Sequence, residues 1–175
     1  KHGTLNPEAE QKTELDIVFD ELLTEPKWLI EEEACPFSLI PKEQVGYDKA
    51  TRFAKGCVGD ARLCVEKCKE GDGWACFSMA IAVQRKKGYV QTLSERFFVR
   101  GCKFGVAIAC TNRAAFLLNA NITDQATVKC AADTFEKTCE WNDAWGCVMF
   151  ATMLSRGLGR PQNVDLALKV LAKAC

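Results

Sequence analysis

The sequence contains one histidine in 175 residues, His2, and that histidine lies in an end segment. Nucleophilic catalysis needs a positioned base, most often a histidine, and we place His2 in no such arrangement. Glycine-rich phosphate-binding motifs are also absent, because Gly157-Leu158-Gly159 lies where a linker is expected. The sequence therefore predicts a protein that is not an enzyme and that binds no cofactor.

The sequence also lacks net charge and long apolar runs. Lysine plus arginine number 23, and aspartate plus glutamate number 23, so the formal net charge is zero. Nucleic acids and anionic membranes attract basic surfaces, so we expect neither as a partner. The longest apolar candidate, residues 147–154, is far shorter than the roughly 18 residues that a membrane helix needs. We predict no membrane span.

Cysteine, by contrast, is abundant, at 11 residues. This content is high for a reducing compartment and favours disulfides in an oxidising one. Zinc sites usually space paired ligands about two to four residues apart, and only Cys64-x-x-x-Cys68 fits. The Cys-x-x-Cys motif of thioredoxin-like redox sites does not occur. We therefore expect no metal site and interpret the cysteines as disulfide candidates.

Six cysteines form three pairs whose members are eight residues apart. The pairs are Cys68 and Cys76, Cys102 and Cys110, and Cys139 and Cys147. Residues eight apart in a continuous helix are separated by about 12 Å, whereas a disulfide tolerates roughly 4.4–6.8 Å between Cα atoms. If these pairs are bonded, the chain must reverse between them. Turn and cap residues such as Gly71-Asp72-Gly73 and Asn142-Asp143 support such a reversal.

Apolar residues on both sides of each pair recur with helical spacing, which predicts a helix before and a helix after it. The first cysteines, Cys68, Cys102, Cys139 and then Cys175, are spaced by 34, 37 and 36 residues. A period of this length built from one helix pair indicates a helical solenoid. We predict an all-α fold with about three repeats over residues 57–175, the last continuing beyond Cys175.

Residues 1–56 are predicted to form an N-terminal helical cap over the first repeat. Asn6-Pro7, followed by acidic residues, predicts a helix that runs to Leu23 or Thr24. A second short helix is expected around residues 28–30, a loop over residues 35–41, and another helix over residues 47–55.

The last repeat resembles a Sel-one-like repeat, a relative of the tetratricopeptide repeat. The resemblance is carried by Trp145-Gly146-Cys147, by Leu154-Ser155-Arg156-Gly157-Leu158-Gly159 and by residues 165–175, DLALKVLAKAC. The cysteine spacing resembles the cysteine-rich branch of that family, typified by the Helicobacter cysteine-rich proteins. The earlier repeats match at the cysteines and helix stripes but lack the Gly-x-Gly linker. The resemblance covers roughly residues 57–175.

This resemblance implies a right-handed α/α solenoid with one disulfide in each repeat, which would bond the three pairs spaced by eight. Cys57 and Cys64, seven apart, look like the same arrangement with one residue removed. Cys175 stands where the first cysteine of another pair is expected. Cys35 and Cys130 are left unassigned, since a long-range bridge between them and a free, buried Cys130 are both compatible with the sequence.

The resemblance also implies a function, that of a protein-binding scaffold or adaptor. Such proteins are secreted or periplasmic, and some relatives act in the mitochondrial intermembrane space. Two alternatives stay open: an assembly or redox-linked factor with functional thiols, and a penicillin-binding or weakly β-lactamase-type enzyme. Against the last alternative, the Ser-x-x-Lys signature is absent.

Large aromatic and arginine side chains are the candidate partner contacts, because these types are enriched at binding hot spots. Trp74, Trp141 and Trp145 lie in or beside the turns between paired cysteines. Arg113 and Phe116 lie at the edge of their helix's apolar stripe and are predicted to face a concave groove. The expected partner is another protein or peptide.

Overall fold

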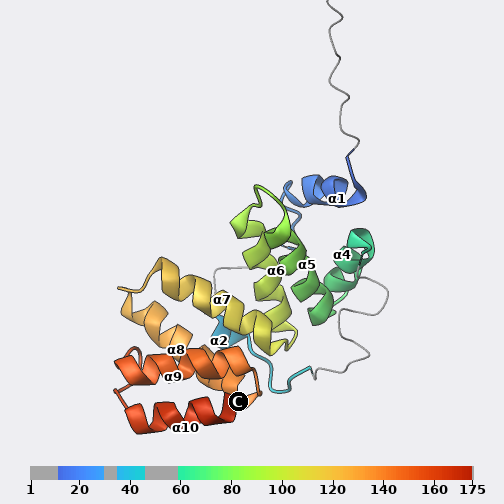
Figure 1. Ribbon diagram of the computed structural model, residues 1–175. Helices are drawn as coiled ribbons and strands as arrows, with labels where there is room; N and C mark the ends of the chain where they lie inside the picture. Colours follow the sequence, from blue (N-terminus) through green and yellow to red (C-terminus); the bar gives the residue numbers. More distant parts are fainter. Residues whose placement is uncertain (1–11, 30–34, 46–58, 175) are drawn as a thin grey trace, which may run out of the picture.

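The structure is a computed structural model that describes residues 12–29, 35–45 and 59–174 (Figure 1). Every regular element in this part of the chain is a helix, which confirms the predicted all-α class. The helices are α1 (Glu14–Leu22), α2 (Pro36–Leu39), α4 (Ala61–Lys69), α5 (Gly73–Arg85), α6 (Gln91–Lys103), α7 (Ala107–Ala120), α8 (Gln125–Glu140), α9 (Ala144–Arg156) and α10 (Val164–Ala174).

The joints α4–α5, α6–α7 and α8–α9 share one backbone structure. The third residue after the first cysteine has a positive φ at each joint: 107° at Gly71, 86° at Gly105 and 62° at Asn142. The next backbone N–H bonds to a carbonyl five residues earlier, as from Asp143 to Thr138 at 3.0 Å. A left-handed residue ends one helix directly before the cap of the next, so each joint reverses the chain within three residues.

A disulfide closes each of these joints. The Cα atoms are 4.6 Å apart in Cys68–Cys76, 4.5 Å in Cys102–Cys110 and 4.4 Å in Cys139–Cys147. We call these three bridges the staples, and all six of their cysteines are buried. Cys64 is also disulfide-bonded, but its predicted partner Cys57 lies outside the described residues, as does Cys175.

From α4 to α10, each helix packs against the next along the chain. One apolar core joins α1, α4, α5 and α6 around Met79, Phe97 and Phe98, and a second joins α7, α8, α9 and α10 around Phe135 and Met153. Most helices of the array bury surface against helices on both sides, so a hairpin alone would leave apolar surface in water. Among the described residues no helix follows α10, which lies at one end of the array (Figure 1).

The sequence predicts that the N-terminal region caps the first repeat. In the structure, this region packs along several hairpins. Helix α1 contacts α4, whereas α2 contacts α6, α7 and α8. Cys35 is bonded to Cys130 of α8, with Cα atoms 5.9 Å apart. Downstream of α2, the Val45 N–H donates to the Gly105 carbonyl at 3.1 Å. Residues 35–45 therefore form a strap that spans three helices of the array.

Several N-terminal boundaries differ from the predictions. The helix start predicted at Asn6 lies outside the described residues. A continuous helix from there is wrong at Thr13, which has extended backbone and shares a capping box with Asp16, so α1 starts at Glu14. Residues 27–29 form a turn, so the short helix predicted around residues 28–30 is wrong at Trp28 and Leu29, whereas Ile30 lies outside the described residues. The predicted loop over residues 35–41 contains α2, because Pro36 fits the first helical position, where no N–H partner is needed. The helix predicted over residues 47–55 lies outside the described residues.

Candidate functional site

The three tryptophans predicted as partner contacts have different surroundings. Trp74 is half-buried and packs edge-on against Phe77, with ring centroids 5.8 Å apart. Trp141 is also half-buried, and the Lys137 Nζ lies 5.7 Å from the centre of its ring. Trp145, on the first turn of α9, is exposed. Trp145 is therefore the tryptophan of these three that is most available to a partner.

Arg113 lies inside the array and not on a groove. Its guanidinium pairs with the Glu95 carboxylate at 3.1 Å, and both side chains are only 8% exposed. The same guanidinium lies 5.5 Å from the ring centre of Phe116, which is half-buried. Burial raises the pKa of Glu95 to about 6, although the nearby guanidinium opposes that shift. These contacts make Arg113 a link between α6 and α7 and leave little of its side chain exposed.

Exposed apolar side chains gather instead on α9 and α10. We define the α9–α10 surface by Trp145 and Val148 of α9 and by Val164, Leu168 and Leu171 of α10. Val164, Leu168 and Leu171 are spaced by four and three residues, so they form one stripe on one side of α10. The opposite flank of that helix holds Leu166, which is exposed as well.

The stripe on α10 corresponds to a stripe on α8 that is covered. Shifting α8 by 36 residues, the spacing from Cys139 to Cys175, places Val128, Ala132 and Phe135 on Val164, Leu168 and Leu171. The three α8 residues are 7%, 0% and 0% exposed, whereas their α10 counterparts are 52%, 61% and 37% exposed. Helix α9 packs against α8, and Cys139, on the same side of α8, is bonded to Cys147 of α9. The difference in exposure therefore follows from the lack of a covering helix among the described residues.

A second comparison within the chain connects the two halves of the α9–α10 surface. By the same cysteine register, Phe77 of α5 corresponds to Val148, and Phe98 of α6 corresponds to Leu171. The rings of Phe77 and Phe98 lie 6.0 Å apart. We therefore expect Val148 and Leu171 to be neighbours, which makes the surface continuous across the two helices.

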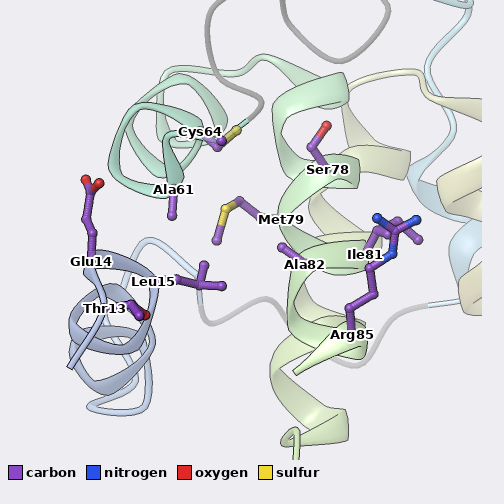
Figure 2. A pocket seen from close by; sticks show the side chains of 11 residues that line it. Thr13, Glu14, Leu15, Ala61, Cys64, Ser78, Met79, Ile81, Ala82 and Arg85 are labelled. Carbon is purple, nitrogen blue, oxygen red and sulfur yellow. The ribbon is translucent and has the colours of Figure 1, made fainter. Parts of the chain in front are cut away.

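A pocket of about 640 Å³ lies between α1, α4 and α5. Figure 2 shows Leu15, Ala61, Cys64 and Met79 pointing into the space between these helices. The hydroxyl of Ser78, which also lines the pocket, is buried and makes no hydrogen bond among the described residues. Glu14 also lines the pocket, but no hydrogen bond joins its carboxylate to the Ser78 hydroxyl, so the pocket shows no formed nucleophile–base pair.

The Asp143 carboxylate, which is half-buried, has structural partners. It accepts a hydrogen bond from the Gly146 N–H at 3.0 Å and another from the Thr111 hydroxyl. Burial raises the pKa of Asp143. Across residues 12–29, 35–45 and 59–174, no three His, Cys, Asp or Glu side chains gather in a way that could hold a metal ion. In the same ranges no helix is long and apolar enough to cross a membrane.

The sequence marked Trp145 but missed most of the α9–α10 surface. The helical spacing of Ala167, Val170 and Leu171 predicts that all three face the core, yet Leu171 is exposed. The sequence contains a signal for this exposed surface. Val164, Leu166 and Leu168 make α10 apolar on more than one side, which is unusual for a helix with one buried face.

Comparisons of the chain with protein-family models, with curated proteins and with solved structures find no match.

Proposed function

We propose that this chain is a non-enzymatic protein-interaction scaffold, a right-handed α/α solenoid of cysteine-rich Sel-one-like repeats, whose α9–α10 surface binds one helix of a partner protein. Repeat arrays present extended surfaces of this kind, and amphipathic helices commonly dock in apolar grooves. The main observation in support of this proposal is the stripe on α10. Its side chains are exposed at positions where the equivalent stripe on α8 is covered by a helix.

The helices that cover such stripes within the chain indicate the chemistry of the partner. Small residues occupy three positions around the second staple cysteine: the residue before it, the cysteine itself, and the fourth residue after it. These residues are Ala75, Cys76 and Ala80 in α5; Ala109, Cys110 and Ala114 in α7; and Gly146, Cys147 and Ala151 in α9. All nine are buried. The proposed partner helix therefore carries small side chains at this spacing, which lets its backbone approach the leucines of α10 closely.

Disulfides support the proposed oxidising compartment. Four bridges have both partners in the described residues, and such a number is typical of secreted, periplasmic or similarly oxidising surroundings. We propose a secreted or periplasmic location, with the mitochondrial intermembrane space as the alternative.

A peptide-binding experiment tests the proposed surface. The probe is a fluorescent peptide with the sequence of residues 143–157 of this chain, carrying Cys147→Ala, because that segment covers α8 in the structure. We expect it to bind the protein and to bind the Leu168→Asp variant about 10-fold to 100-fold more weakly, since burying one leucine side chain contributes roughly 1.5–3 kcal/mol. Leu166→Asp is the matched control, because Leu166 is exposed on the same helix but off the stripe. Its affinity should stay unchanged.

Any one of four results would overturn this proposal. The first is that the peptide does not bind, and the second is that Leu166→Asp weakens binding as much as Leu168→Asp does. Alternatively, analytical ultracentrifugation finds a dimer that Leu168→Asp dissolves, which would make a second copy the occupant. Finally, hydrogen exchange on a longer form of the chain shows Leu168 and Leu171 protected by residues that follow Cys175.

A further inference from the structure

The Cys35–Cys130 disulfide differs from the staples in its accessibility. The six staple cysteines are at most 5% exposed, whereas Cys35 and Cys130 are both half-buried. The staples also join residues eight apart, whereas 95 residues separate Cys35 from Cys130. Thiol–disulfide exchange requires a thiolate to reach a sulfur atom, so accessibility separates this bridge from the others.

A pocket of about 290 Å³ opens onto this disulfide. Both cysteines line it, together with Arg113, Leu117, Asn121 and Thr127. The pocket thus provides room beside the sulfurs, and polar side chains with which a small polar molecule could bond. Two other pockets, one between α1, α4 and α5 and one beside Phe19, Val83 and Leu93, are not lined by a staple cysteine.

The Arg113 guanidinium also lines this pocket, although the Glu95 carboxylate offsets part of its charge. One of its terminal nitrogens, Nη1, pairs with Glu95. Its Nε is buried and has no hydrogen-bond partner among the described residues. A guanidinium beside a breaking disulfide favours the thiolate that leaves, because it stabilises the developing negative charge.

We propose that Cys35–Cys130 is a thiol–disulfide exchange site that takes a thiol as its substrate. A thiolate enters the pocket and attacks one of the two sulfurs, so that a mixed disulfide forms while the Cys35–Cys130 bond breaks. The electron pair of that bond leaves on the other cysteine as a thiolate. A second thiolate then attacks the mixed disulfide and releases the remaining cysteine. Two substrate thiols become one disulfide, and the bridge gains two electrons and two protons.

Reduction of this bridge lowers the stability of the fold but leaves the staples in place. Reduction removes the covalent link between the strap and α8, whereas the staples, which are buried, keep every hairpin closed. This inference does not rest on the proposed partner surface, since the α9–α10 surface contains neither cysteine.

Timed alkylation of the native, disulfide-intact protein tests the inference. Reduced glutathione and reduced thioredoxin are added in separate arms, free thiols are quenched with N-ethylmaleimide, and the labelled cysteines are identified by peptide mass mapping. We expect Cys35 and Cys130 to be labelled at least about 10-fold faster than the six staple cysteines. Exchange with either reagent supports the site and identifies whether a small thiol or a protein thiol reaches it.

A steric variant separates exchange at the pocket from general loosening of the fold. Ala126 is exposed and lines the pocket, so Ala126→Trp should slow labelling of Cys35 and Cys130 several-fold. Ala172→Trp, an exposed alanine of α10 far from the pocket in sequence, should leave the rate unchanged. The proposal fails if staple cysteines are labelled first or at the same rate, if neither thiol reduces the bridge, or if both tryptophan variants behave alike.

Discussion

The Thr111 hydroxyl of α7 donates a hydrogen bond to the Asp143 carboxylate, which at the same time caps the N-terminus of α9. One half-buried carboxylate thus accepts from a backbone N–H at a helix start and ties two successive hairpins together. Asp124, by contrast, caps α8 through Thr127 within its own helix and is exposed. The two aspartates therefore form a natural comparison between a local cap and a cap that also makes a tertiary contact.

Asp143→Ala is expected to destabilise the protein more than Asp124→Ala. Losing a cap costs about 1 kcal/mol. Losing the Thr111 hydrogen bond costs about a further 0.5–1.5 kcal/mol, because that hydroxyl can still donate to the Thr138 hydroxyl or to the Ala107 carbonyl. Urea unfolding followed by circular dichroism measures both. Equal losses in the two variants would mean that the Thr111 contact contributes nothing to stability.

The buried Glu95–Arg113 pair predicts a pH dependence of stability. The pKa of Glu95 is raised from 4.5 to about 6 in the folded protein, so the folded state binds the proton more tightly than the unfolded state. The contribution of Glu95 is therefore most favourable below pH 4.5 and is lost as the pH rises through about 6. A shift of this size corresponds to about 2 kcal/mol.

Glu95→Gln should remove that contribution. We expect the difference in free energy of unfolding between the wild type and Glu95→Gln to change by about 2 kcal/mol, in favour of the variant, as the pH rises through this window. Denaturant titrations at several pH values measure it. A difference that stays constant with pH would show that Glu95 does not titrate as its burial indicates.

Removing the Cys35–Cys130 bridge should cost more stability than removing one staple. On the loop-entropy model a closed loop of nine residues contributes about 2.5 kcal/mol and one of 96 residues contributes about 4.7 kcal/mol. The double variants Cys35→Ala with Cys130→Ala and Cys139→Ala with Cys147→Ala are compared by urea unfolding. If the staple variant is the less stable one, packing of the buried sulfurs outweighs loop entropy.

Gly105→Ala is expected to destabilise the α6–α7 joint and to loosen the strap. Gly105 has a φ of 86°, and a Cβ there would lie 3.1 Å from the Val45 nitrogen and 3.2 Å from the Glu43 carbonyl oxygen. The left-handed conformation alone costs a non-glycine residue about 1–2 kcal/mol. Thermal unfolding measures the loss, and hydrogen exchange at Val45 reports the strap.

Gly88→Ala is the control for that variant. Gly88 also has a positive φ, of 71°, but nothing lies within 4 Å of a Cβ added there. The Gly88→Ala variant should therefore lose the stability that a left-handed backbone costs a non-glycine residue, but should keep the protection of Val45 against hydrogen exchange. Loss of protection in both variants, or in neither, would contradict a specific role of Gly105 in holding the strap.

The joints could be predicted from the sequence because their causes are local. Cysteines eight residues apart, with Gly71-Asp72 or Asn142-Asp143 between them, specify a helix end, a reversal and a helix start within a few residues. The helical stripes needed no knowledge of distant neighbours, since the 3.6-residue period is a property of each segment. The helical hairpins and the spacing of the staple cysteines therefore came from the sequence alone, whereas the bonding of each pair was implied by the family resemblance.

Which stripe is covered, and by what, was decided by the tertiary structure. The periodicity of α6 and α7 did not show that Arg113 finds Glu95 across the two helices, and nothing local joins Cys35 to Cys130 over 95 residues. Leu171 and Phe135 occupy equivalent positions in equivalent helices, yet only Phe135 is buried. Apolar spacing identifies a face that water disfavours, but burial depends on whether another helix packs on that face, and this is a property of the array and not of the segment.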